Sequence, residues 1–174
     1  YANIDEFDAT KYKLEYDKLS VMDKWVLSKL NTVVKSVDNC LENYKITETT
    51  RILQDFIDDL SNWYVRRSRE RFWETGMPQD KINAYMTLYT CLVTFAKVCA
   101  PMIPFMAESI YQNLVCNVDK SAPASIHLCD YPEINENLID TALETAMDEV
   151  VNIVVLGRAA RNGSNIKNRQ PLNT

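Results

Sequence analysis

The sequence predicts an all-α fold, a bundle of about five helices with one short strand-like segment. Only three glycines occur among 174 residues, which argues against a turn-rich β fold. Apolar residues recur at spacings of three and four in several long stretches, the pattern of helices that bury one face. With 47% apolar residues, the chain is long enough for one domain with a substantial core, and we expect a single domain over residues 1–174.

The first two helices follow an irregular lead-in at residues 1–19. Ser20, followed three residues later by Asp23, predicts a helix start, and the apolar spacing extends that helix to about Asn43. A second helix begins near Thr47 and runs without Gly or Pro to Gly76. At roughly 28 residues, or ~40 Å at 1.5 Å per residue, it would form the axis of the bundle.

Three further helices complete the prediction. The third opens at Gln79 or Asp80 and ends before Pro101, and the fourth starts near Pro104. Residues 125–131, between two prolines, form the strand-like segment. The last helix begins near residues 135–137 and stops around Gly163, leaving residues 164–174 as a basic C-terminal extension.

The most unusual stretch is residues 60–73, LSNWYVRRSRERFW, with four arginines within six residues. At about 100° per residue, one uninterrupted helix separates the arginines into two sets. Arg67 and Arg71 point toward neighbouring helices as structural arginines, which need partners there. Arg66 and Arg69 lie on the opposite face with Trp73, where they face solvent or a partner. The other aromatic residues, Trp25, Trp63, Tyr64 and Phe72, are assigned to packing.

Two interpretations of this arginine run remain open from spacing alone. The simpler one is a salt-bridged helix end, since Glu70 and Glu74 lie within three or four residues of arginines. The alternative is a nucleic-acid surface, because arginines interleaved with aromatic side chains suit phosphates and unstacked bases.

Charge and composition exclude several functions. The net charge is −5 and all 24 acidic residues precede residue 150, so any RNA contact would be local. His127 is the sole histidine, and no cysteine pair has metal-binding or redox spacing. We predict no catalytic residue, no metal site and no cofactor in this chain. Free cysteines, no signal peptide and no long apolar run predict a cytoplasmic protein without a membrane partner.

Four stretches carry a resemblance to a known family: residues 60–73, DKWVLSKLN at 23–31, APMIPFMAESIYQNL at 100–114 and GRAARNGSNIKNRQPL at 157–172. Together they resemble the anticodon-binding helical domain of isoleucyl-tRNA synthetases, which are class I aminoacyl-tRNA synthetases. The run WYVRRSRERFW is the most specific of them. The two ATP-site signatures of that class have no match in this sequence.

The resemblance implies that the chain is the tRNA-reading part of a larger enzyme that joins isoleucine to its tRNA with ATP and Mg²⁺. Its partners would be the anticodon stem-loop of the isoleucine tRNA and the remaining synthetase domains, not DNA. In the resembled family a helix would precede Tyr1. Lys167 and Arg169 match the family's NIKNRQPL element, either as RNA contacts or as a joint.

Two alternatives remain from the sequence. The first is a helical bundle with a purely structural or protein-interaction role, whose arginines form internal salt bridges. The second is the same domain from a valyl or leucyl enzyme.

Overall fold

The computed structural model describes residues 2–167 and 169–171, and within them it contains six α-helices and no strand. The chain divides into two compact units, residues 1–139 and residues 140–174. An all-α bundle is therefore confirmed. The expectation of one domain over residues 1–174 stays a prediction.

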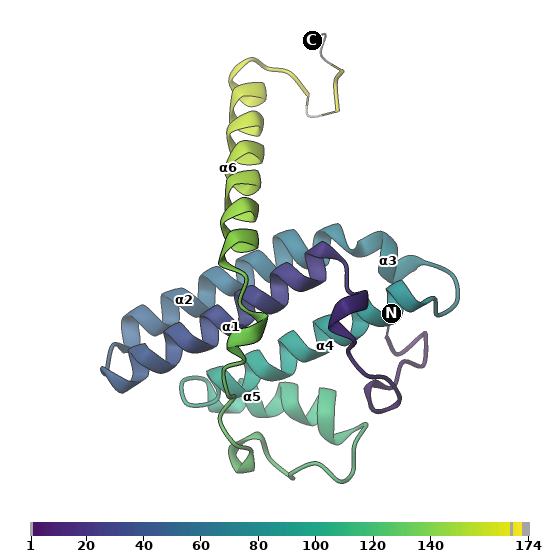
Figure 1. The fold of residues 1–174 in the computed structure, drawn as a ribbon, viewed down its shortest axis with the longest axis vertical. Helices are drawn as coiled ribbons and strands as arrows, with labels where there is room; N and C mark the ends of the chain where they lie inside the picture. The colour runs from purple at the N-terminus through teal and green to yellow at the C-terminus, as the bar shows by residue number, and fades with distance from the viewer. Residues whose placement is uncertain (1, 168, 172–174) are drawn as a thin grey trace. The chain divides into compact units, whose positions relative to one another are not determined.

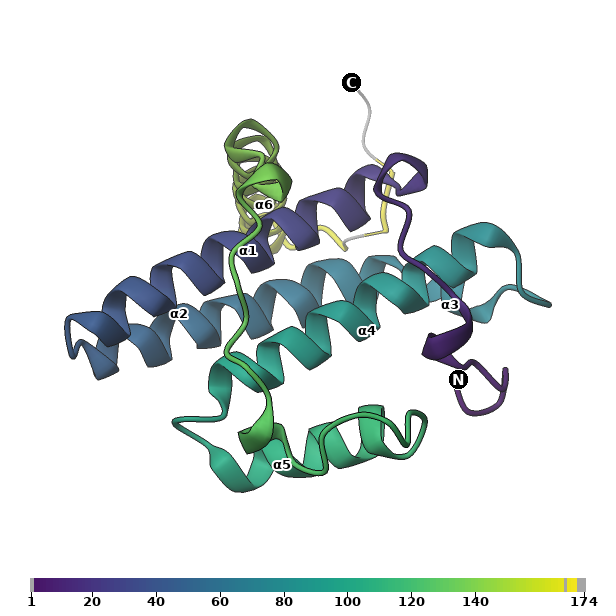
Figure 2. The same cartoon turned by 60° about the horizontal axis from the view of Figure 1, so that its bottom comes forward.

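The first unit is built on α1 (Val21–Glu42), α2 (Ile46–Asp59) and α4 (Gln79–Cys99), which lie side by side in Figures 1 and 2. α1 begins where the sequence predicts, because Ser20 and Asp23 exchange hydrogen bonds in a capping box. Side chains from all three helices fill the core between them, and the Phe56 and Phe95 rings stack at 5.5 Å between centroids. The most deeply buried side chains of this unit include Trp25, Val26, Leu27, Val37, Phe56, Tyr64 and Val98.

The long second helix of the sequence analysis is not continuous. After α2 the chain forms a π-helical segment, Leu60–Val65, and then bends at Ser68 before α3 (Arg69–Trp73). A π segment puts more residues into a turn than an α-helix does, so it shifts the phase of every side chain that follows. A single helical wheel drawn for residues 60–73 therefore does not hold beyond Val65, and it misplaces Arg67.

The expected strand-like segment is also wrong. Ile126–Leu128 forms one turn of 3₁₀ helix, and Glu108 of α5 (Pro104–Tyr111) organises it. The Glu108 carboxylate accepts hydrogen bonds from Ser125 Oγ at 2.8 Å and from the Ile126 backbone N–H at 2.9 Å. A second π-helical segment, Gln112–Cys116, extends α5 toward this loop. The loop is thus held by a side chain on a helix and not by strand pairing.

The lead-in is ordered by contacts with α4 and contains two short 3₁₀ helices, Ala9–Lys11 and Tyr16–Lys18. The buried Lys81 ammonium pairs with the Asp5 carboxylate at 2.8 Å, and the Tyr85 hydroxyl donates to the same carboxylate at 2.5 Å. Phe7 packs on the Tyr85 ring at 4.9 Å. These contacts attach the first residues of the chain to the bundle.

α4 is long and apolar enough, by length and composition alone, to cross a membrane, which the sequence analysis did not anticipate. Within the most apolar stretch of α4, 56% is buried inside the fold. Its buried side chains, among them Ala84, Cys91 and Val98, pack in the core of the first unit. This is the pattern of a core helix.

The second unit consists of α6 (Thr141–Gly163) and the residues after it. The helix starts later than predicted, because Glu136–Leu138 forms a separate 3₁₀ turn. Asp140 then caps α6 by accepting a hydrogen bond from the Leu143 backbone N–H at 2.9 Å. Of the predicted C-terminal extension, residues 168 and 172–174 lie outside the described residues.

Candidate nucleic-acid interface

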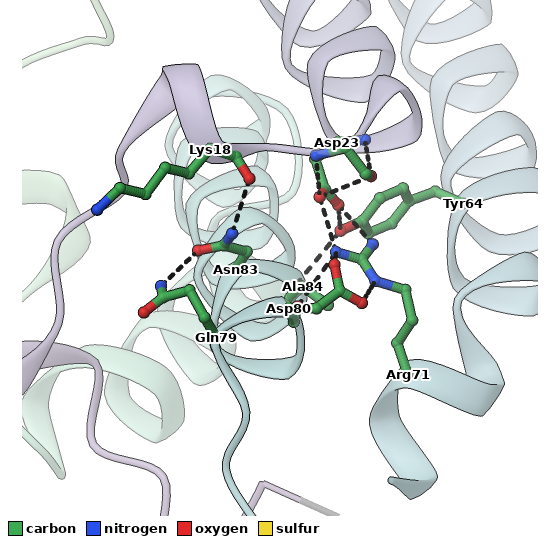
Figure 3. A network of polar contacts seen from close by, with 9 residues as sticks. Lys18, Asp23, Tyr64, Arg71, Gln79, Asp80, Asn83 and Ala84 are labelled. Atoms are coloured by element: carbon green, nitrogen blue, oxygen red, sulfur yellow. Dashed lines mark hydrogen bonds and ion pairs between the residues drawn. The ribbon is translucent and has the colours of Figure 1, made fainter.

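Arg71 on α3 connects three helices of the first unit. Its two terminal nitrogens donate to both oxygens of Asp23 on α1, each at 2.8 Å. Its Nε donates to Asp80 Oδ2 at 2.7 Å, and Nη2 reaches Asp80 Oδ1 at 2.8 Å, at the start of α4. Figure 3 shows the guanidinium between the two carboxylates. Such a bidentate pair fixes the orientation of the guanidinium as well as its distance from the carboxylate.

Asp23 is fully buried and receives more than the arginine. The Tyr64 hydroxyl donates to Asp23 Oδ1 at 2.6 Å, and the Ser20 hydroxyl donates to Oδ2 at 2.8 Å. Burial by itself would raise the pKa of Asp23, but the hydrogen bonds from Arg71, Tyr64 and Ser20 outweigh it, so the pKa lies below its ordinary value. Burial and the nearby carboxylate raise the pKa of Tyr64. Asp23 is therefore a stable carboxylate and Tyr64 a stable donor.

The other three arginines of the run point outward. Arg66 and Arg69 are exposed, as the sequence analysis expects. Arg67 is exposed too, so its assignment as a structural arginine facing the bundle is wrong. Its guanidinium lies over the Trp63 ring, 5.4 Å from the centroid, in a cation–π contact. The physical reason is the phase shift introduced by the π-helical segment before it.

Trp73 ends α3 and is 56% exposed. With Arg69 it borders an open pocket of about 550 Å³. Trp73 also borders a second hollow, which it shares with Glu70, Arg71 and Glu74. The exposed indole of Trp73 and the three outward arginines all lie within residues 66–73, and we call these four side chains the arginine surface.

Lys167 and Arg169 belong to the second unit, and both are exposed. The chain around them is held by Arg161 of α6, whose Nη1 donates to the Lys167 and Gln170 backbone carbonyls, each at 2.9 Å. The sequence analysis did not single out Arg161. Its position eight residues before Arg169 carries no motif that could have identified this role.

Comparison with known proteins identifies the family. The family described as the anticodon-binding domain of tRNA ligase matches residues 23–174. The chain belongs to this family. It is 59% identical to an isoleucine–tRNA ligase of Clostridium novyi and 55% identical to that of Clostridium acetobutylicum, each over 99% of the chain. A third relative, from Clostridium tetani, is 52% identical over 100% of the chain. The chain spans 16–17% of the length of these relatives.

As an anticodon-binding domain, the chain has few groups suited to metal binding or to nucleophilic catalysis. Among the described residues, no group of three or more His, Cys, Asp and Glu could hold a metal ion. All five cysteines are free thiols. Burial raises the pKa of the Cys91 thiol, and it raises that of Cys99 to about 12. Such thiols are inert near neutral pH, because the thiolate is the reactive form.

The Arg71 network predicts a large stability difference between two arginines of one run. Arg71→Ala leaves the buried Asp23 carboxylate without its cation, and we expect a loss of about 3 kcal/mol in the free energy of unfolding. Arg66→Ala, the matched control, removes an exposed side chain and should change it by at most about 0.5 kcal/mol. Urea denaturation of both variants measures the difference. Equal midpoints would refute the role assigned to Arg71.

The lowered pKa of Asp23 predicts a pH dependence of stability. In the unfolded chain this carboxyl titrates at about 3.9. The contribution of the Asp23 carboxylate to the free energy of unfolding is therefore complete above that pH. It is lost as the pH falls through the lower pKa of Asp23 in the folded chain. We expect Asp23→Asn to be less stable than the unmodified chain at pH 7 and the gap to narrow below about pH 4. Urea denaturation across this range tests it, and a gap that widens toward acid would contradict it.

Proposed function

We propose that the chain is the tRNA-binding domain of an isoleucine–tRNA ligase and that it contacts the anticodon stem-loop of the isoleucine tRNA. The structural observation that supports this is the arginine surface, where Arg69 and Trp73 stand on the short helix α3 that Arg71 anchors, and the exposed Arg66 and Arg67 directly precede that helix. The relatives are named isoleucine–tRNA ligases, and their matches cover nearly the whole of this chain.

The proposed RNA contacts come from the arginine surface. Arg66 and Arg69 are assigned to phosphates, because an exposed guanidinium can donate two parallel hydrogen bonds to phosphate oxygens. Trp73 is assigned to stacking on an unpaired anticodon base. Arg67 joins them as a further contact. Its stacking on Trp63 limits the motion of a long side chain, so less entropy is lost when it binds.

Lys167 and Arg169 are proposed in the two roles that the sequence left open. Both side chains are exposed and can meet phosphates, while Arg161 holds the Lys167 and Gln170 backbone carbonyls by hydrogen bonds. Such hydrogen bonds also suit a joint to another part of the ligase. Substituting each residue in the full-length ligase and measuring tRNA affinity separates these roles.

The remaining parts of the proposal concern the ligase as a whole. Activation of isoleucine with ATP and Mg²⁺ is assigned to domains outside this chain, which itself needs no cofactor. Those domains and the isoleucine tRNA are the proposed partners. We propose neither DNA nor a membrane as a partner. A cytoplasmic location accords with this role.

RNA binding through the arginine surface predicts a clear loss on mutation. Arg66→Ala/Arg69→Ala should weaken binding of the isoleucine anticodon arm and lower the log–log salt slope by about 0.7–0.9 for each phosphate contact removed. Trp73→Ala should cost about 1–3 kcal/mol if a base stacks on the indole. Titrations at two salt concentrations measure both effects. Arg51→Ala, an exposed arginine on α2, is the control. If it weakens binding as much, the arginine surface is not the site.

The assignment of catalysis to other domains predicts that the chain is inactive by itself. Purified free of host enzyme, it should support no isoleucine-dependent exchange of pyrophosphate into ATP and no charging of tRNA. The full-length ligase is the positive control. Exchange above background by the chain alone would overturn this part of the proposal.

A further inference from the structure

The end of α6 is closed by backbone hydrogen bonds that all lie within the second unit. The Ser164 N–H donates to the Ala160 carbonyl at 3.1 Å, and the Ile166 N–H donates to the Arg161 carbonyl at 2.9 Å. Between them Asn165 adopts a left-handed φ of 55°, which asparagine accepts more readily than most residues after a helix end. The residues that follow therefore start close to the last turn of the helix.

The Arg161 side chain extends this closure to the next residues. Its Nη1 donates to the Lys167 and Gln170 carbonyls, each at 2.9 Å. The Gln170 backbone N–H donates to the Lys167 carbonyl at 2.9 Å, a hydrogen bond of the kind that closes a β-turn. One guanidinium nitrogen thus holds both ends of the turn at residues 167–170, which we call the basic turn.

The basic turn has little else to hold it. Arg161 is half-buried, whereas Lys167, Arg169, Gln170 and Pro171 are all exposed. An exposed polar segment buries no apolar surface to offset the entropy that ordering costs. Hydrogen bonds from a charged donor are stronger than those between neutral groups. The order of this turn therefore depends mainly on Arg161.

The side chains around the basic turn suit RNA phosphates. Residues 150–174 contain Arg158, Arg161, Lys167 and Arg169 and no acidic residue, so the local field is positive. The same residues contain no aromatic side chain on which a base could stack. Arginine and lysine contacts to phosphate oxygens position a protein on nucleic acid and carry no sequence information. The basic turn differs in this respect from the arginine surface, which includes the indole of Trp73.

We infer that Arg161 is a positioning residue for tRNA binding, which holds Lys167 and Arg169 in place to meet backbone phosphates without being a contact itself. The inference rests on the proposed function, and it favours RNA contact over a joint for these two residues. A fixed turn loses less conformational entropy on binding than a mobile one, so its contacts yield more affinity. Removing Arg161 should therefore weaken tRNA binding only while Lys167 and Arg169 are present.

A double-mutant cycle in the full-length ligase tests this inference, with affinity for the isoleucine tRNA measured by fluorescence anisotropy at fixed salt. We expect the paired variant Lys167→Ala/Arg169→Ala to weaken binding several-fold and Arg161→Ala to weaken it by a similar or smaller factor. Added to the paired variant, Arg161→Ala should have no further effect. An effect that persists there means that Arg161 makes a contact of its own, and it overturns the inference. An absence of any effect of Arg161→Ala alone overturns it as well.

Arg158→Ala is the matched control, because Arg158 is an exposed arginine one turn earlier on the same helix. Its substitution removes the same charge, so its effect on binding should be equal with and without Lys167→Ala/Arg169→Ala. If Arg158→Ala also loses its effect in the paired variant, loss of charge explains both arginines and the inference is overturned.

Amide hydrogen exchange of the 174-residue chain, followed by NMR, gives a readout without RNA. Arg161→Ala should speed exchange at Gln170 several-fold, because the Lys167 carbonyl that accepts from this N–H is no longer held. Ile166 donates to the Arg161 backbone carbonyl, which the substitution retains, so its exchange should not change. Unchanged exchange at Gln170, or equal acceleration at both residues, overturns the inference.

The possible failures are distinguishable. If Lys167→Ala/Arg169→Ala leaves binding unchanged while Arg66→Ala/Arg69→Ala weakens it, the RNA role of the basic turn falls together with this inference, and the arginine surface stands. If neither paired variant affects binding, the proposed function itself fails. If Lys167→Ala/Arg169→Ala weakens binding and Arg161→Ala does not, the inference alone fails.

Discussion

The ion pair between Asp23 and Arg71 determines how the end of the arginine run is held. The backbone between α2 and α3 passes through a π-helical segment and a bend at Ser68, and α3 itself has only five residues. A helix this short is not stable alone. Its direction must therefore come from tertiary contacts, and the two parallel hydrogen bonds to Asp23, with two more to the Asp80 carboxylate, supply them. The outward position of Arg69, on the same short helix, follows from this anchor.

A buried ion pair is not an efficient source of stability, because removing two charges from water costs nearly as much as their attraction returns. Here it provides orientation. Asp23 caps α1, accepts from Tyr64 and pairs with Arg71, so one carboxylate ties the start of α1 to the π-helical segment and to α3. An apolar replacement could fill the space. It would not define the rotation of α3 about its own axis.

The sequence predicted what depends on local spacing and missed what depends on distant partners. The apolar periodicity and the Ser20 cap located α1 and α4 closely. The π-helical segment has no sequence signal of that kind, and one such segment reversed the direction of Arg67. Residues 125–131 have the composition of a strand, but Glu108, seventeen residues before Ser125, holds them as a turn. Arg71 was expected to face inward, yet no spacing could identify Asp23, 48 residues away, as its partner.

The acidic body of the chain restricts where RNA can approach. With a net charge of −5 and every acidic residue before position 150, long-range attraction to phosphates is weak over most of the surface. Favourable contacts must come from a few side chains at short range, where geometry decides the energy. Fixed positions then matter more than the number of positive charges, since a mobile arginine loses entropy on binding. The sequence meets this requirement by using one arginine of the run to hold the helix that presents Arg69 and Trp73.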